Sequence, residues 1–199
     1  MGCGTNKSLE EKPNIPPSQK TKIIENYNTN EKQKQNQNSN VILNVNSKPK
    51  SKRDLFIEIA LNKHNEYRSL HGVEPLTISE KINNIAQKYA EHLASINKMV
   101  HSNNENYGEN LYWCMGRQIN GADMTNSWYE EIHTYDFNIP VFKSDSGHFT
   151  QVIWKESKKV GFGFAKSKDG GYFGVANYYP AGNIDSPEDF KENVLRKKT

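Results

Sequence analysis

The sequence predicts an α+β domain, with helices around a small antiparallel sheet, preceded by a disordered arm. Segments with apolar residues at three- and four-residue steps come first, and two runs with strand character, 160–165 and 172–179, follow them. Helices that precede paired strands, without strict alternation, are typical of an α+β layered domain. Nearly all Trp, Tyr and Phe residues lie beyond residue 53, so only the later part of this 199-residue chain can build a core.

The predicted arm comprises residues 1–53, and the domain comprises residues 54–199. The arm is rich in Asn, Gln, Lys, Ser and Pro, and such a composition cannot bury enough apolar surface to fold. Ten Lys and Arg against four Glu give the arm a charge of +6, whereas the domain carries −3. A basic arm suits an anionic membrane surface or a soluble spacer. Nucleic acid is not an expected partner, because Tyr27 is the arm's one aromatic residue for stacking on bases.

The cysteine content and hydropathy indicate an intracellular protein. The two cysteines, Cys3 and Cys114, exclude a disulfide framework. No early apolar run resembles the core of a signal peptide, and none approaches the roughly 20 apolar residues of a spanning helix. We therefore expect a chain that is neither secreted by a signal peptide nor membrane-spanning.

The start of the chain, Met1-Gly2-Cys3, is a candidate lipid anchor. After removal of Met1, Gly2 can accept a myristoyl chain and Cys3 a palmitoyl chain, although Asn6 stands where the usual pattern has Ser or Thr. One acyl chain holds a protein to a bilayer only marginally, and a second chain or a basic patch makes the attachment stable. Cys3 and the lysines of the arm supply both of these second signals. Alternatively, Gly2 is an ordinary second residue.

Two helices are predicted at the start of the domain. Asp54 is a plausible N-cap for a helix to about Leu70, and Gly72 suits its C-terminal cap. His64 lies within this helix, and we expect it to be structural. The pattern Thr77-Ile78-Ser79-Glu80 predicts a capping box that opens the second helix. Apolar residues then recur on one face of that helix: Ile82, Ile85, Ala86, Tyr89, Ala90 and Leu93.

A short strand near Glu109 and a third helix from about Gly121 are expected next. The third helix has an apolar face with a glutamate, Glu131, on the same side of the helix. A carboxylate at such a position needs a partner or a cleft, because burial of an unpaired charge is costly. A glutamate at the rim that reaches water is the alternative.

The segment after residue 145 combines a histidine with a buried run. His148 directly precedes four apolar residues, Phe149, Val152, Ile153 and Trp154, whose packing would anchor the backbone that presents its imidazole. Gly147 permits a close approach or an unusual backbone angle. Taken alone, His148 is interpreted as a core histidine, since a lone His is weak evidence for a site.

The end of the chain contains the predicted strand pair. Asp169-Gly170 predicts a hairpin turn between the runs 160–165 and 172–179. Pro180-Ala181-Gly182-Asn183 ends the second strand, and a polar tail follows it to the end.

From about residue 56 to residue 195, these segments resemble the CAP superfamily of cysteine-rich secretory proteins, venom antigens and plant pathogenesis-related proteins. Residues 147–157 match one family motif throughout, and residues 173–184 match a second in part. Gly174 stands where a larger apolar residue is usual, and Ala176 where secreted members have a disulfide cysteine. The resemblance implies an α-β-α layered domain of the CAP type.

Within this superfamily, the chain most resembles the intracellular, acylated, Golgi-associated branch. The similar features are few cysteines, the Gly2-Cys3 start and the blocks 128–132 and 179–183. The resemblance implies a place on the cytosolic face of the Golgi, another endomembrane or the plasma membrane. It also implies membrane lipids as partners, including anionic lipids or sterols, and self-association as a homodimer. The long arm departs from this branch, and a secreted protein exported without a signal peptide is the alternative.

The family's cleft holds two histidines and two glutamates, which the resemblance places at His101, Glu109, Glu131 and His148. Zn²⁺ or another divalent cation accepts such ligands, and two protein ligands, His101 and His148, would leave positions open for water. The glutamates would orient the histidines or such a water. A membrane-associated binding module for lipid, metal or protein is therefore expected rather than an enzyme. The alternative is a metal-dependent hydrolase or protease that uses the same cleft.

Overall fold

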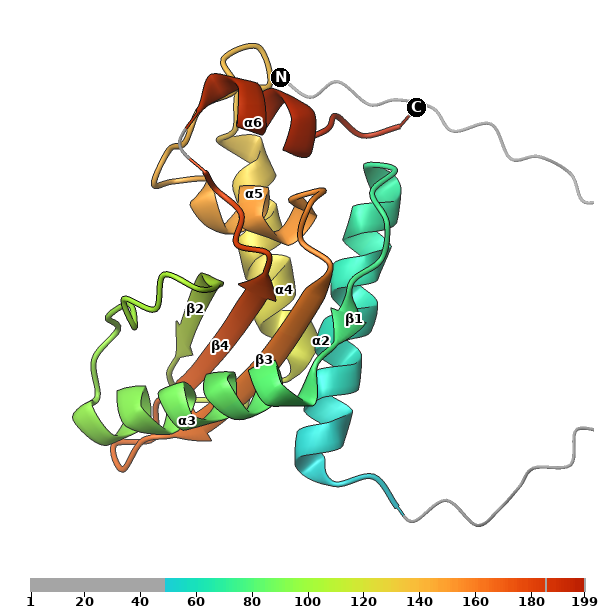
Figure 1. Cartoon of the computed structure of the whole chain (residues 1–199). Coiled ribbons are helices and arrows are strands. Elements are labelled where there is room, and N and C mark those ends of the chain that lie inside the picture. The colour runs from blue at the N-terminus through green and yellow to red at the C-terminus, as the bar shows by residue number, and fades with distance from the viewer. Residues whose placement is uncertain (1–48, 185, 199) are drawn as a thin grey trace, which may run out of the picture. The chain divides into compact units, whose positions relative to one another are not determined.

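The computed structural model describes residues 49–184 and 186–198 of the chain. These residues form five α-helices, one short 3-10 helix and four strands (Figure 1). In chain order, the elements are α2 (Lys52–Leu70), β1 (Thr77–Ile78), α3 (Glu80–Ile96), β2 (Gly108–Cys114), α4 (Gly121–Glu130), η2 (Glu131–His133), α5 (Gly147–Ile153), β3 (Lys159–Lys166), β4 (Tyr172–Tyr179) and α6 (Pro187–Asn193). The predicted lipid anchor at Gly2 and Cys3, and most of the predicted arm, lie outside the described residues.

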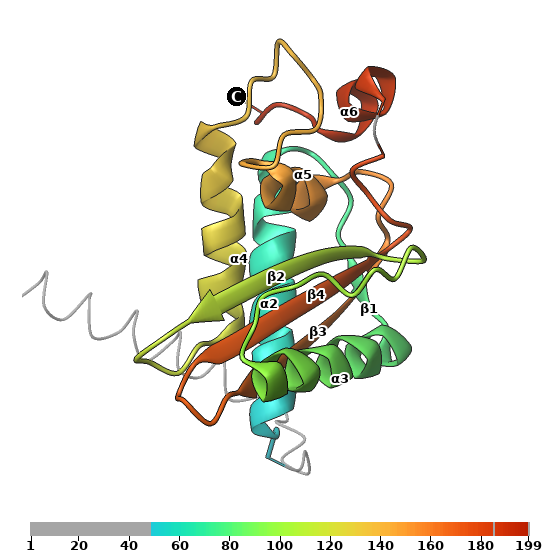
Figure 2. The ribbon, with the colours of Figure 1, turned by 90° about the vertical axis from the view of Figure 1, so that its left-hand side faces the viewer.

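The domain has three layers, as Figure 2 shows. Helix α3 covers one face of the sheet, and α2, α4 and α5 lie on the other face. The strand order is β1-β3-β4-β2, so β2 is an edge strand. The predicted α+β class is therefore confirmed. The sheet is mixed rather than purely antiparallel, because β1 pairs with β3 in parallel while β3–β4 and β4–β2 are antiparallel.

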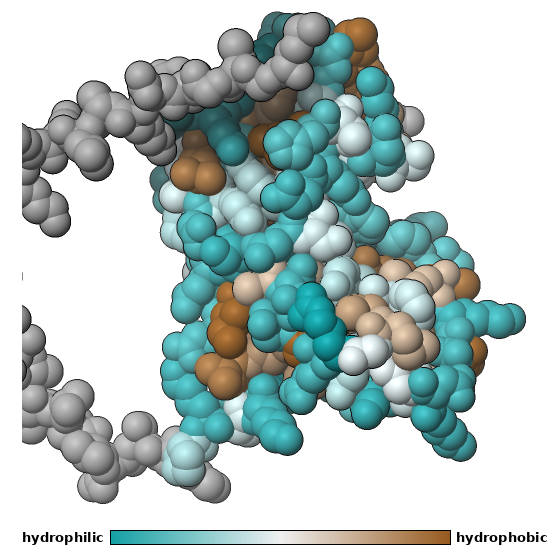
Figure 3. Space-filling view, turned by 180° about the vertical axis from the view of Figure 1, so that it is seen from behind, coloured by the Kyte–Doolittle hydropathy of each residue, from teal (hydrophilic) through white to brown (hydrophobic). Residues whose placement is uncertain are grey.

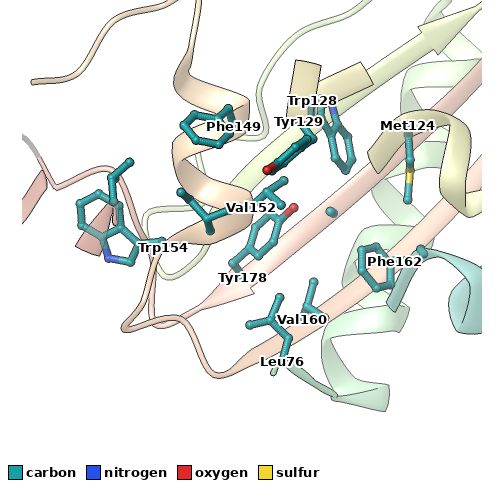
Figure 4. Close-up of a cluster of buried hydrophobic side chains, with 14 of the residues drawn as sticks. Leu76, Met124, Trp128, Tyr129, Phe149, Val152, Trp154, Val160, Phe162 and Tyr178 are labelled. Carbon is teal, nitrogen blue, oxygen red and sulfur yellow. The ribbon is translucent and has the colours of Figure 1, made fainter. Parts of the chain in front are cut away.

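The larger part of the core lies between the sheet and helices α2, α4 and α5 (Figure 4). Phe149, Val152 and Ile153 of α5 are completely buried, so the apolar run after His148 anchors its helix as predicted. On the opposite face, Ala86, Ala90 and Leu93 of α3 pack against the sheet. The apolar stripe predicted for the second helix is therefore confirmed.

The start of α2 differs from the prediction. Ser51 is the N-cap, and its hydroxyl oxygen accepts a hydrogen bond of 3.1 Å from the backbone N–H of Asp54. The Asp54 carboxylate in return accepts from the backbone N–H of Ser51 at 3.1 Å. The assignment of Asp54 as N-cap is wrong, because it is the third helical residue of a reciprocal capping box. Gly72, with φ of 66°, follows the C-cap as predicted.

The start of α3 also differs. Thr77 and Ile78 form strand β1, with Thr77 paired to Lys159, and the helix begins at Glu80 with no side-chain cap from Ser79. The Thr77 hydroxyl donates to the carbonyl of Lys158 at 3.2 Å rather than capping a helix. The predicted capping box is therefore wrong, because pairing with β3 satisfies these groups instead.

The C-terminal segment is not a uniformly polar tail. Ser186 caps helix α6, and Phe190 of that helix is completely buried against the Trp154 ring, with centroids 5.1 Å apart. After α6 the chain returns to the end of α2, where the backbone N–H of Lys198 donates to the carbonyl of Leu70 at 2.8 Å. The prediction missed this helix because a seven-residue segment with one large apolar residue gives almost no periodicity.

The face of the domain drawn in Figure 3 is predominantly polar. Figure 3 shows one face, on which hydrophilic residues predominate and hydrophobic residues form smaller groups between them. Among the helices that the structure describes, none combines the length and the hydropathy needed to span a bilayer.

His64 is buried in the core, which confirms the expectation that it is structural. Its Nδ1–H donates to the carbonyl of Ala60 at 2.8 Å, and its Nε2 accepts from the Tyr178 hydroxyl at 2.8 Å. Burial lowers the pKa of His64 from 6.5 to about 3. Between these two pH values the unfolded chain binds a proton that the folded chain excludes.

We therefore expect the free energy of unfolding to fall as the pH drops from about 6.5 towards 3, with His64 contributing up to about 1.4 kcal/mol per pH unit. Urea unfolding at several pH values in this range measures the slope. His64→Gln should reduce this slope by close to the contribution of one proton, about 1.4 kcal/mol per pH unit. His92→Gln, at an exposed position, should retain the wild-type slope. Equal slopes for the wild type and His64→Gln would contradict this account.

Candidate functional site

Glu131 and His148 form the first of two histidine–glutamate pairs. Glu131 follows the last residue of α4, and its carboxylate accepts the imidazole Nδ1–H of His148 at 2.6 Å. The same carboxylate accepts the backbone N–H groups of His148 at 3.0 Å and Phe149 at 3.2 Å. Glu131 thus has the partner that its position on the apolar side requires, and it fixes both the ring and the backbone of His148.

Trp128 of α4 supports this pair from behind. Its indole ring is 2% exposed and stacks on the imidazole of His148, with centroids 6.2 Å apart and an interplanar angle of 21°. Its Nε1–H donates to the carbonyl of Leu111 on β2 at 2.9 Å. The indole therefore connects α4, the edge strand and His148 through one rigid side chain.

His101 and Glu109 form the second pair. His101 lies in the loop after α3 with its side chain 61% exposed, whereas the Glu109 side chain on β2 is 8% exposed. The His101 Nδ1–H donates to Glu109 at 2.9 Å, and this hydrogen bond raises the pKa of His101. Burial alone would raise the pKa of Glu109, but hydrogen bonds from His101 and Ser102 outweigh burial and leave that pKa lowered.

The two pairs belong to opposite faces of the sheet and meet at the edge strand β2. Side chains alternate along a strand, so Glu109 and Asn110 point to opposite faces. Glu109 lies on the α3 side with His101, and Asn110 lies on the α5 side, where its Nδ2–H donates to the carbonyl of His148 at 3.0 Å. A cleft of about 240 Å³ opens at this edge, lined by His101, Glu109, Asn110, Phe142, Ser144, Gly147, His148 and Asn183.

The structure brings three of the four predicted residues into the cleft wall. His101, Glu109 and His148 line it directly, whereas Glu131 lies behind His148 and orients it. Asn110 and Asn183 also line the cleft, and neither of them had a predicted role, although Asn183 lies in a segment similar to a family block. Asn183 holds the wall by donating from Nδ2 to the carbonyl of Gly147 at 2.8 Å.

The donor set is partly suited to a divalent cation. Each histidine gives its Nδ1–H to a carboxylate, which leaves Nε2 without a hydrogen bond inside the part of the chain that the structure describes. A carboxylate behind a histidine is the arrangement that orients metal ligands in proteins. No cluster of three or more His, Cys, Asp or Glu side chains suited to a metal occurs within residues 49–184 and 186–198. Two imidazoles would therefore be the protein's contribution, and the hydrolase alternative stays a prediction.

Of the two departures from the family motifs, the one at Gly174 has a local packing explanation. The sulfur of Met124 would be 2.9 Å from a Cβ atom at Gly174, so the side chain of α4 occupies the room of the larger residue. Ala176 is completely buried in the core, and Cys114 is a free thiol.

Comparison with known proteins gives consistent results. Residues 61–178 match the family model described as the cysteine-rich secretory protein family, CAP. The human Golgi-associated plant pathogenesis-related protein 1 is 44% identical over 152 residues, which cover 75% of this chain and 98% of that protein. Pathogenesis-related protein 1C of Nicotiana tabacum is 38% identical over 126 residues, or 62% of this chain and 74% of that protein.

A crystal structure of NaASP2 with Zn²⁺ shares the fold, with a TM-score of 0.56 at 18% identity, over 77% of this chain and 90% of that one. The fold and the family model thus agree. The chain belongs to the CAP family, with relatives of the pathogenesis-related and Golgi-associated type.

Proposed function

We propose that this CAP protein is a binding module of an endomembrane surface, whose cleft binds a divalent cation such as Zn²⁺ through His101 and His148. One observation carries the metal part: both histidines are oriented by a carboxylate at Nδ1 and line one cleft. NaASP2, which shares the fold, has a crystal structure with Zn²⁺, and this supports the choice of cation.

A cation held by two imidazoles keeps open coordination positions, which oxygen ligands can take. Carboxylate or phosphate oxygens of a lipid headgroup have the required chemistry, so metal binding and lipid binding are compatible in one cleft. Asn110 and Asn183 supply further polar groups in the wall. The proposed function is therefore recognition of an anionic group rather than catalysis.

Replacement of His148 by Ala should weaken Zn²⁺ binding by at least about tenfold, because it removes one of two imidazole ligands. Isothermal titration of the full-length protein with Zn²⁺ at neutral pH measures this. His133→Ala is the matched control, because His133 is exposed and pairs with Glu130 away from the cleft. Equal affinities for the wild type and His148→Ala would refute the cation site.

The membrane part of the proposal rests on the sequence and on one relative. Gly2 and Cys3, with the basic residues of the arm, supply two signals for stable attachment. The human relative is Golgi-associated by name, which favours an endomembrane surface for this chain. Lipids of that surface would then be the candidate partners of the cleft.

Gly2→Ala should move most of the protein from the membrane fraction to the soluble fraction, because an alanine cannot accept the myristoyl chain. Cell fractionation followed by immunoblotting measures the distribution. Gly4→Ala, two positions further along, is the control and should leave it unchanged. If Gly2→Ala is recovered with membranes as the wild type is, the anchor is wrong.

A further inference from the structure

Three buried polar side chains form a hydrogen-bonded chain from the core to the cleft. His64 of α2, Tyr178 of β4 and Asn110 of β2 are each 2% exposed or less. The Tyr178 hydroxyl is 2.8 Å from Nε2 of His64 and 3.3 Å from Nδ2 of Asn110. Nδ2 of Asn110 also donates to the carbonyl of His148 at 3.0 Å. A histidine in the core is thus connected to the histidine in the cleft wall.

The direction of every hydrogen bond in this chain is determined. The carbonyl of Ala60 can only accept, so the proton of His64 is on Nδ1 and its Nε2 accepts from Tyr178. The Tyr178 oxygen then has only acceptor capacity left, and it takes the amide N–H of Asn110. Because burial lowers the pKa of His64 and raises the pKa of Tyr178, neither group ionises near neutral pH. The amide of Asn110 is therefore held in one orientation.

Glu109 and Asn110 together hold both cleft histidines from one strand. These neighbours point to opposite faces of β2, where Glu109 binds the imidazole of His101 and Asn110 binds the backbone of His148. Strand β2 is paired with β4 along its whole length, from the pair Gly108 and Tyr178 to the pair Cys114 and Tyr172. This pairing holds positions 109 and 110 in place. Two adjacent residues of one strand therefore contact both halves of the site.

We propose that Asn110 is a positioning residue, which sets the place of His148 relative to His101 and thereby the cation affinity of the cleft. His64 and Tyr178 act through it by fixing its amide. The inference rests on the proposed function, because it concerns how the ligands of the same cation site are positioned. A purely structural network would stabilise the fold without changing the environment of the His148 ring.

Two measurements on the full-length protein separate these roles. The first is the ¹⁵N chemical shifts of the His148 imidazole in metal-free protein, and the second is the Zn²⁺ affinity by titration. Asn110→Ala should shift the His148 resonances and weaken Zn²⁺ binding by about 10- to 100-fold, the usual effect of losing a partner that orients a ligand. Tyr178→Phe should change both in the same direction by less, and it decides the question if Asn110→Ala does not fold.

Asn83→Ala is the matched control. Asn83 is 1% exposed and its partners are Glu80 and Phe162, neither of which lines the cleft. It should lose stability but keep the His148 shifts and the Zn²⁺ affinity. Unchanged His148 chemical shifts in both Asn110→Ala and Tyr178→Phe would overturn the inference. Wild-type protein that does not bind Zn²⁺ would refute the proposed function, and the metal-free shifts would still decide the role of Asn110.

Discussion

Replacement of Arg68 by Met is expected to remove a large part of the stability of the domain. The Arg68 side chain is completely buried, and it donates to four backbone carbonyls rather than to a carboxylate. Nε donates to Glu74 at 2.8 Å, Nη1 to Val152 at 3.1 Å and Trp154 at 2.9 Å, and Nη2 to Ser157 at 3.0 Å. One guanidinium therefore ties α2 to the loop before β1 and to the turn after α5.

Methionine has a similar volume but no donors, so it would leave these carbonyls without partners. A buried acceptor without a donor costs about 1–3 kcal/mol, and hydrogen bonds from charged groups are the stronger ones. We expect a loss of more than about 4 kcal/mol, against a total stability of about 5–15 kcal/mol for a typical domain. Burial lowers the pKa of Arg68 to about 10, so the group is still charged at neutral pH.

Urea unfolding followed by circular dichroism measures the loss. Arg53→Met is the control, because Arg53 is partly exposed and forms a surface ion pair with Glu80, for which a loss below about 1 kcal/mol is expected. Arg68→Lys should lie between the two, since a lysine keeps the charge but cannot span four carbonyls. A midpoint for Arg68→Met within error of the Arg53→Met midpoint would contradict this role.

The sequence predicts best those features that depend on short stretches. The apolar stripe of α3 is periodic along the helix, the runs of β3 and β4 are rich in aromatic and β-branched residues, and the turn at Asp169-Gly170 has its own signature. The predicted strands, residues 160–165 and 172–179, agree with the observed strands to within one residue at each end. Local propensity and tertiary packing favour the same structure in these segments.

Two capping predictions failed, one because a distant segment competed for the same groups and one because two local caps act together. Thr77 has the right spacing to Glu80 for a capping box, but β3 offers it a strand partner 82 residues away. At the start of α2, the sequence offers two capping residues, Ser51 and Asp54, and both take part in one box. For Thr77 the deciding contact is tertiary, whereas at α2 both hydrogen bonds of the box are local, and propensity alone does not rank two neighbouring caps.

The candidate site also depends on contacts between residues that are distant in the sequence. His101 and His148 are 47 positions apart in the sequence, and their pairs lie on opposite faces of the sheet. The sequence spacing therefore does not predict that the two histidines share a cleft. Resemblance to the family placed them together, and the structure adds what orients them. Asn110 was missed because its importance comes from the neighbours that it reaches, Tyr178 and His148, and not from its residue type.

Replacement of Gly161 by Ala is the second change expected to have a large effect, because α3 lies directly against β3 at this point. A Cβ atom at Gly161 would be 2.2 Å from both the backbone nitrogen of Asn83 and the carbonyl carbon of Ile82. These are main-chain atoms of a helix, so they cannot move aside individually. The methyl group would therefore push the whole helix away from the sheet.

This close approach also protects the edge of β3 beyond the end of β1. The side-chain oxygen of Asn83 accepts the backbone N–H of Phe162 at 2.9 Å, and that of Gln87 accepts the N–H of Phe164 at 3.2 Å. The helix thus takes the place of a neighbouring strand and leaves no open edge there. An alanine at position 161 would lengthen these bonds as well as crowd the helix.

We expect Gly161→Ala to lower the free energy of unfolding by about 3 kcal/mol, the upper part of the usual range for overpacking. Gly174→Ala is the control, since its nearest contact is the flexible thioether of Met124, and a loss below about 1.5 kcal/mol is expected. Hydrogen exchange should show a specific increase at the Phe162 and Phe164 amides in Gly161→Ala. If both variants unfold at the same urea concentration and these amides stay protected, the contact between α3 and β3 tolerates a side chain and the account of the edge is wrong.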